Sequence, residues 1–187
     1  MGNIAPKRVD EATGASGGGG PSSPTPVPAA ASATQTSAWN TAGTMEQRHM
    51  ASWVKDKLVG LLGGLAPVEV AGRGTLRFSG EVKGWEEGGS TADILLARGK
   101  TKKVYDLHFT VVIDLVASPP PSSPQKVLLK FLDVSNDTAG EARAVKVEFE
   151  GGPTEEMKDA IKSALDASLL AAVRGAVEET ISAFLTL

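Results

Sequence analysis

The chain has 187 residues and a formal net charge of −3, which leaves room for one domain and a tail. Nucleic acid is not expected as a partner, because domains that bind it carry a basic excess that this composition lacks. Cysteine is absent, which excludes disulfides, thiolate metal sites and cysteine nucleophiles and agrees with a reducing compartment. No apolar run approaches the roughly 20 residues of a membrane span, and the N-terminus has no apolar signal region. We therefore expect a cytoplasmic protein without a membrane partner.

Residues 1–37 differ in composition from the rest of the chain. They contain no aromatic residue, but they hold five of the 11 prolines and six of the 21 glycines. A segment of this kind cannot bury enough apolar surface to offset its chain entropy. The sequence therefore predicts a disordered tail over residues 1–37 and one folded domain over residues 38–187.

The first regular element predicted is a helix that begins near Thr44. Thr44 and Gln47 form a capping-box pattern, in which the hydroxyl and the amide each satisfy a free backbone N–H. Gly63, Gly64 and Pro67 end the helix. Apolar residues recur at spacings of three and four residues and so form one apolar stripe, as in an amphipathic helix. The stripe consists of Met50, Trp53, Val54, Leu58, Leu61, Leu62 and Leu65.

From residue 68 to residue 150 the apolar period changes to two, which is typical of strands. Residues 76–83 alternate apolar and polar side chains, and shorter strands are predicted at residues 126–134 and 144–150. One unusually long strand carries six apolar residues on one face, namely Tyr105, Leu107, Phe109, Val111, Ile113 and Leu115. The connections leave no room for helices, so we expect an antiparallel meander of four to five strands with one solvated face.

The last element predicted is a long helix that begins after Pro153 and Thr154, with acidic residues at the positive end of its dipole. Alanines along it favour helix formation and close approach to the sheet. The core stripe is spaced at four residues and consists of Met157, Ile161, Leu165, Leu169, Val173, Val177, Ile181 and Leu185. A helix, an antiparallel meander and a long helix packed along the sheet give an α+β fold.

The string Arg98-Gly99-Lys100-Thr101 contains the end of a phosphate-loop signature. That signature needs a glycine where this chain has Ile94, and it needs a helix to follow, whereas a strand is predicted. We interpret the segment as a hairpin tip with four cations, Arg98, Lys100, Lys102 and Lys103. The tip is either a solvated turn that protects a sheet edge by its charge or a docking patch for an acidic partner surface.

No catalytic constellation is found among the polar residues. His49 and His108 are the two histidines, and without cysteine or HxxxH spacing they do not indicate a metal site. Asp106 and Asp114 lie eight residues apart on one strand, which is too far for a carboxylate pair. No GxSxG elbow exposes a serine nucleophile. We therefore expect no enzymatic activity, no cofactor and no metal.

Several strings share their order and sequence with one known family. The strings are residues 51–58 on the first helix, Arg98-Gly99-Lys100 at the tip, Tyr105-Asp106-Leu107 on the long strand and residues 157–187 in the last helix. On these residues the chain resembles the N-terminal domain of the activators of the 90 kDa heat-shock protein ATPase, a co-chaperone family. The resemblance covers residues 39–187, and the basic tip followed by the aromatic-Asp-Leu step is its most specific part.

The chain departs from the family pattern at three places. The family's opening rich in Asn and Trp is reduced to Trp39-Asn40, and a single cation, Arg98, precedes the tip glycine. The family's usual second domain is absent, so the chain is similar to the short, single-domain members. This departure bears on the strength of activation more than on binding.

The resemblance implies a co-chaperone that lies along the middle segment of the 90 kDa heat-shock protein. It would help to position the loop that carries the chaperone's catalytic arginine, favouring the closed, ATP-competent state, and would itself be a monomer when free. The partner-binding residues that it implies are Arg98, Gly99, Lys100, Lys102, Lys103, Asp106, Trp39 and Asn40. A second hypothesis is a helix-grip carrier, in which a curved sheet and a long helix enclose an apolar cavity for a small lipid.

Overall fold

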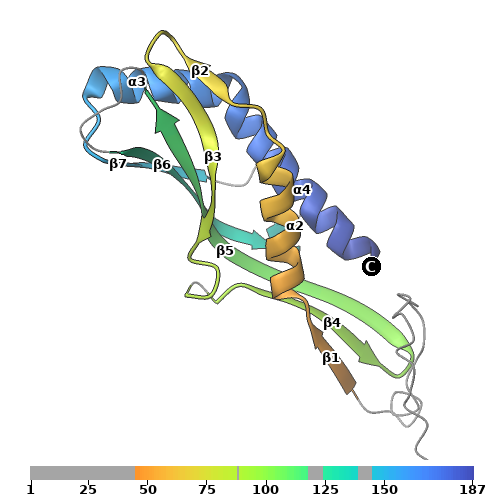
Figure 1. Cartoon of the computed structure of the whole chain (residues 1–187). Helices are drawn as coiled ribbons and strands as arrows, with labels where there is room; N and C mark the ends of the chain where they lie inside the picture. The colour runs from red at the N-terminus through yellow and green to blue at the C-terminus, as the bar shows by residue number, and fades with distance from the viewer. Residues whose placement is uncertain (1–44, 88, 118–123, 139–144) are drawn as a thin grey trace, which may run out of the picture. The chain divides into compact units, whose positions relative to one another are not determined.

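The computed structural model describes residues 45–87, 89–117, 124–138 and 145–187. The predicted tail over residues 1–37, together with Trp39 and Asn40, lies outside these ranges. In the described residues, seven strands form one antiparallel sheet and the helices pack on one of its faces (Figure 1). The predicted α+β class is therefore confirmed, although the described strands outnumber the four to five expected.

The strands are β1 (Met45–His49), β2 (Val68–Val70), β3 (Gly74–Lys83), β4 (Thr91–Ala97), β5 (Lys100–Val116), β6 (Gln125–Ser135) and β7 (Val145–Glu150). β4 and then β3 pair with the first and second parts of β5, and β6 pairs with the opposite side of β5 from Asp106 to Leu115. β1 extends the sheet beyond β4, β2 beyond β3, and β7 beyond β6. Every other described strand is thus held directly or through one neighbour by β5.

The core lies on the face of β5 that the alternation predicts. The six apolar residues from Tyr105 to Leu115 are all buried in one cluster with side chains from the helices. These helices are α2 (Ala51–Gly63), α3 (Glu155–Ala164) and α4 (Leu170–Thr186). α2 contacts β3, β4 and α4, and α3 contacts β2. No helix within the described part of the chain is long and apolar enough to cross a membrane.

The predicted start of the first helix is wrong. Gln47, the second member of the proposed capping box, lies in strand β1, and α2 begins only at Ala51. Met50 precedes it and has no side-chain cap, but its backbone N–H donates to the carbonyl of Ala92 at 2.7 Å. The full length of β1 pairs with β4, and this tertiary pairing outweighs the roughly 1 kcal/mol that an N-cap contributes. The predicted end at Gly63 and Gly64 is confirmed.

The long C-terminal helix begins as predicted, because the Thr154 hydroxyl accepts a hydrogen bond from the Met157 N–H. Between α3 and α4, residues Leu165–Leu169 form a π-helical segment, where the chain changes direction (Figure 1). With 3.6 residues per α-helical turn, a stripe spaced at four drifts by about 40° at each step. The wider π turn absorbs part of that drift. Beyond Ile181 the next core residue is Phe184, which is 1% exposed, whereas Leu185 is 43% exposed. The predicted place of Leu185 in the core is therefore wrong.

The predicted close approach holds for only some of the alanines of this helix. Ala176 is buried and Ala160 and Ala164 pack against the core, but Ala167, Ala171 and Ala172 are exposed. These three side chains therefore contribute helix propensity and no close contact with the sheet.

A buried charge tests the packing of α4 on the sheet. Val173 is fully buried, and its neighbour Ala172 is exposed. We predict that Val173→Asp lowers the free energy of unfolding by about 3 kcal/mol or more, because it buries an unpaired carboxylate. The control Ala172→Asp should change it by less than about 1 kcal/mol. Equal denaturation midpoints for the two variants would contradict this packing.

Candidate functional site

The tip between β4 and β5 is a two-residue turn formed by Arg98 and Gly99. Their φ angles are +48° and +74°, and Ala97 pairs with Lys100 on either side of them. Positive φ at both central residues is the geometry of a type I′ hairpin turn, whose twist matches that of the flanking strands. The predicted hairpin is therefore confirmed, and its backbone holds the exposed Arg98 side chain at the end of the sheet.

The three lysines of this segment divide between the two faces of the hairpin, whereas Arg98 lies in the turn. Successive strand residues point to opposite faces, so Lys100 and Lys102 lie on the face away from the helices and Lys103 lies on the helix face with Tyr105. The Lys103 Nζ donates to the carbonyl of Leu185 at 2.7 Å. A cation at the C-terminal end of a helix is stabilised by the helix dipole. Lys103 therefore binds α4 within the chain. The alternation of side chains along the strand could have indicated that Lys103 lies on the helix face.

The remaining three cations are available to a partner. Arg98, Lys100 and Lys102 are exposed, and none of them forms an ion pair within the described parts of the chain. We call these three residues the basic tip.

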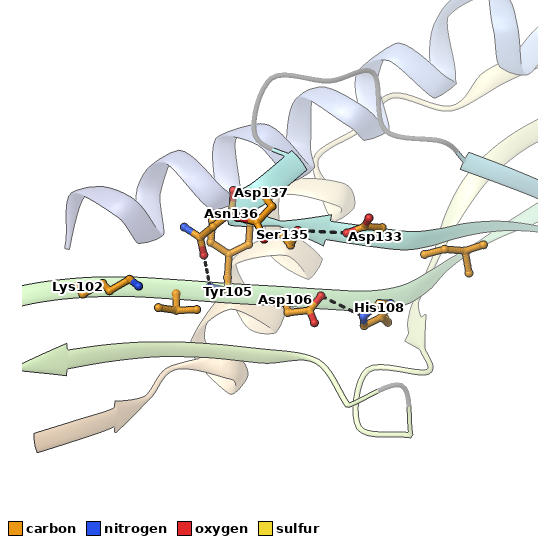
Figure 2. Close-up of a pocket in the computed structure, with 10 residues that line it drawn as sticks. Lys102, Tyr105, Asp106, His108, Asp133, Ser135, Asn136 and Asp137 are labelled. Carbon is orange, nitrogen blue, oxygen red and sulfur yellow. Dashed lines mark hydrogen bonds and ion pairs between the residues drawn. The ribbon is translucent and has the colours of Figure 1, made fainter. Parts of the chain in front are cut away.

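A hollow of about 790 Å³ lies beside the basic tip, on the face of β5 away from the helices (Figure 2). Lys102 and Asp106 both line it, so the structure brings two of the predicted site residues together. The Asp106 carboxylate contacts the His108 ring, with Oδ1 and Nε2 3.1 Å apart. The remaining lining residues are Val104, Tyr105, Leu132, Asp133, Ser135, Asn136 and Asp137.

One wall of the hollow is a β-bulge that the sequence analysis missed. Phe131 pairs with Phe109 and Val134 with Leu107, so the pairing register between β5 and β6 shifts there. An extra residue in a strand re-aims the side chains around it. Leu132 and Asp133 are consequently both exposed, and Leu132 is 56% exposed. No glycine or proline marks the position, and the adjacent apolar and acidic residues are the only signal in the sequence.

Asn136 closes the other end of the hollow. It begins the short 3₁₀ helix Asn136–Thr138 directly after β6. Its Oδ1 accepts from the Tyr105 N–H at 2.7 Å (Figure 2). Its Nδ2 donates to the Lys103 carbonyl at 3.4 Å. The side-chain amide therefore satisfies two backbone groups of β5 that no strand pairs with in the described residues.

Beside the second part of β5, ion pairs lie on the face of the sheet away from the helices. Glu148 lies between Lys130 and Lys146, at 2.6 and 3.0 Å. Its hydrogen bond to Lys130, and then that to Lys146, holds the pKa of Glu148 below its usual range. Because the folded pKa is lowered, any contribution of this group to stability is present at neutral pH and is lost as pH falls through the folded pKa.

Within the described residues, the positions of the acidic residues and histidines indicate neither a metal site nor a catalytic site. His49 contacts Asp93 at 2.7 Å, far along the sequence from the His108 and Asp106 pair. Within the described ranges, no three His, Asp or Glu side chains come together as ligands of a metal ion. The residues that gather around the hollow are suited to binding a polar partner.

No family model and no curated protein matches the chain. A crystal structure of Aha-1 from Plasmodium falciparum is similar to it, with a TM-score of 0.50 and 14% sequence identity over 75% of this chain and 88% of that chain. At this identity the likeness shows the fold alone, so a function must be argued from the surface of this chain.

The different roles of two neighbouring lysines can be measured. We predict that Lys103→Met lowers the free energy of unfolding by about 0.5–1 kcal/mol, because it removes a cation from the end of the helix dipole. Amide hydrogen exchange in the last turn of α4 should rise. The control Lys102→Met removes the same charge from the opposite face and should leave that exchange unchanged. Equal exchange rates in the two variants would show that Lys103 does not hold the helix end.

Proposed function

We propose that this chain is a co-chaperone that binds the middle segment of the 90 kDa heat-shock protein and stimulates its ATPase. The observation that carries the proposal is the basic tip, whose three cations are exposed and unpaired within the described residues at the end of a hairpin. Two further observations support it. The fold is similar to that of Aha-1, and the tip and the step Tyr105-Asp106-Leu107 carry the sequence resemblance to activators of this ATPase.

The charge distribution favours an acidic docking surface on the partner. The chain as a whole has a net charge of −3, so the basic tip is a local field of opposite sign. Complementary charge raises the association rate and fixes the orientation of a complex. Lys100, Lys102 and Asp106 lie on the face of β5 away from the helices, and we propose that the chaperone lies against this face.

The proposed activation is differential binding. A partner shifts a conformational equilibrium only by the difference between its affinities for the two states. A tenfold shift towards the closed, ATP-competent chaperone requires about 1.4 kcal/mol of additional binding free energy. One or two charged hydrogen bonds made in the closed state alone suffice for that shift. In this mechanism the chain contributes no catalytic residue and acts only by stabilising the competent conformation.

The alternative of a helix-grip lipid carrier gains no support from the described residues. Between β5 and α4 the Tyr105 and Phe184 rings meet edge to face at 6.3 Å, and the neighbouring side chains form one buried cluster. An apolar ligand there would have to displace core residues. The hollow beside the basic tip opens instead on the other face, and most of its lining residues are polar.

The test of this proposal is the double variant Arg98→Ala with Lys100→Ala. Exposed charges contribute within about 0.5 kcal/mol to folding, so the melting curve should be preserved. Contacts in a partly desolvated interface are each worth about 1–3 kcal/mol, so we predict at least a tenfold loss of chaperone affinity and a matching loss of ATPase stimulation. Raising the salt concentration should weaken the parent more than the variant.

A matched control is the double variant Lys57→Ala with Lys162→Ala, which removes the same charge from α2 and α3. It should stimulate the ATPase like the parent. Full stimulation by the tip variant at low salt would show that the basic tip is only a solvated turn. An equal loss in both double variants would show that net charge, and not the tip, controls the association.

A further inference from the structure

Part of β5 pairs on one side only. β4 pairs with residues Lys100 to Asp106 on one side, whereas β6 reaches only Asp106, where it pairs through Ser135 and ends. Beyond that point the chain turns into the 3₁₀ helix at Asn136. Among the described residues, no strand lies against the second side of residues 100–105. We call this stretch the open edge.

The direction of each backbone group on the open edge follows from the turn. In a two-residue hairpin the residues that flank the turn exchange hydrogen bonds, so the N–H and C=O of Lys100 face β4. The backbone groups of Thr101, Lys103 and Tyr105 then face away from β4, and the Asn136 amide already binds two of them. The Thr101 N–H, the Thr101 C=O and the Lys103 N–H remain without a strand partner in the described part of the chain.

The side chains around the open edge define the chemistry of an occupant. The basic tip lies at one end of the edge, and Asp133 and Asp137 line the hollow at the other (Figure 2). Between them Val104 and the exposed Leu132 give the hollow apolar surface. An extended segment in line with β6 would run antiparallel to β5, from the acidic end towards the basic tip. Charge complementarity therefore requires a cationic residue at its start and acidic residues at its end.

We infer that the open edge binds such a segment of a partner protein as an added strand. Addition of a strand to an open sheet edge gives affinity through main-chain hydrogen bonds and specificity through alternate side chains. Asn136 fixes the register of the added strand. Its side-chain amide already occupies the backbone groups of β5 that follow the last free N–H, so the added strand has to stop there. The inference rests on the proposed function only for the identity of the partner, and the edge itself can be tested without the chaperone.

The probe is a short synthetic peptide with alternating valines, a lysine near its N-terminus and glutamates near its C-terminus. Amide hydrogen exchange of the whole chain is measured by NMR with and without an excess of this peptide. We expect the Thr101 and Lys103 amides to exchange rapidly in the free chain and to become protected on binding. The same peptide with N-methyl groups on its edge-facing amides should bind at least about fivefold more weakly, since it cannot form the ladder.

Two proline variants separate strand addition from attraction by charge alone. Thr101→Pro removes an N–H that faces away from β4, so the hairpin ladder is kept, and peptide affinity should fall at least about fivefold. The control Gln47→Pro removes an outward N–H from β1, the opposite edge of the same three strands, and should bind like the parent. Circular dichroism establishes that both variants are folded.

Three outcomes would overturn the inference. The first is no binding of the peptide at millimolar concentration. The second is binding of the peptide without protection of the Thr101 and Lys103 amides. The peptide would then be bound only by charge attraction to the basic tip, and not as an added strand. The third is protection that rises with protein concentration and needs no peptide, which would mean that a second copy of the chain fills the edge. None of these results depends on ATPase stimulation, so failure of the proposed function and failure of this inference are distinguishable.

Discussion

The length of β5 is the constraint on which the rest of the structure depends. Its 17 residues span roughly 55 Å at about 3.3 Å per residue. The strands β3, β6 and β7 lie along its second part, whereas β4 and β1 are the strands along its first part. The C-terminal end of α4 also contacts the first part through Lys103. The first part therefore extends from the five-strand region as a narrow hairpin (Figure 1). Its tip and its open edge are the parts of the described structure that a partner can approach from several sides.

Alternation along this one strand separates stability from binding. Tyr105 packs on α4 through Phe184, and Lys103 on the same face binds the end of that helix. Lys102, Val104 and Asp106 face the hollow instead. In the hairpin part of β5, Tyr105 and Lys103 therefore act on folding, whereas Lys102 and Asp106 are exposed and lie outside the core. This division allows the hairpin to pack on α4 and yet to present exposed charge.

The sequence predicted the elements whose side chains alternate cleanly and missed those defined by contacts with distant residues. The period of two from Tyr105 to Leu115 identified β5 and its buried face. Strand β1 has no such pattern, because four of its five residues are exposed, and only its pairing with β4 makes it a strand. The strict spacing of four in the last helix already implied a wider turn, and the π segment supplies it. The bulge at Leu132 has no sequence signal strong enough to find it. The hydrogen bonds of the Asn136 side chain to β5 depend on residues distant in the sequence.

We propose that the chaperone docks on the basic tip and the face of β5 away from the helices. The most direct measurement is site-specific photo-crosslinking to the purified chaperone, with the photoreactive residue at position 102 or, on the helix face, at position 162. The account predicts crosslinks from position 102 to an acidic region of the chaperone's middle segment, and few from position 162. Crosslinks that form only from position 162, or that reach no part of the middle segment, would contradict it.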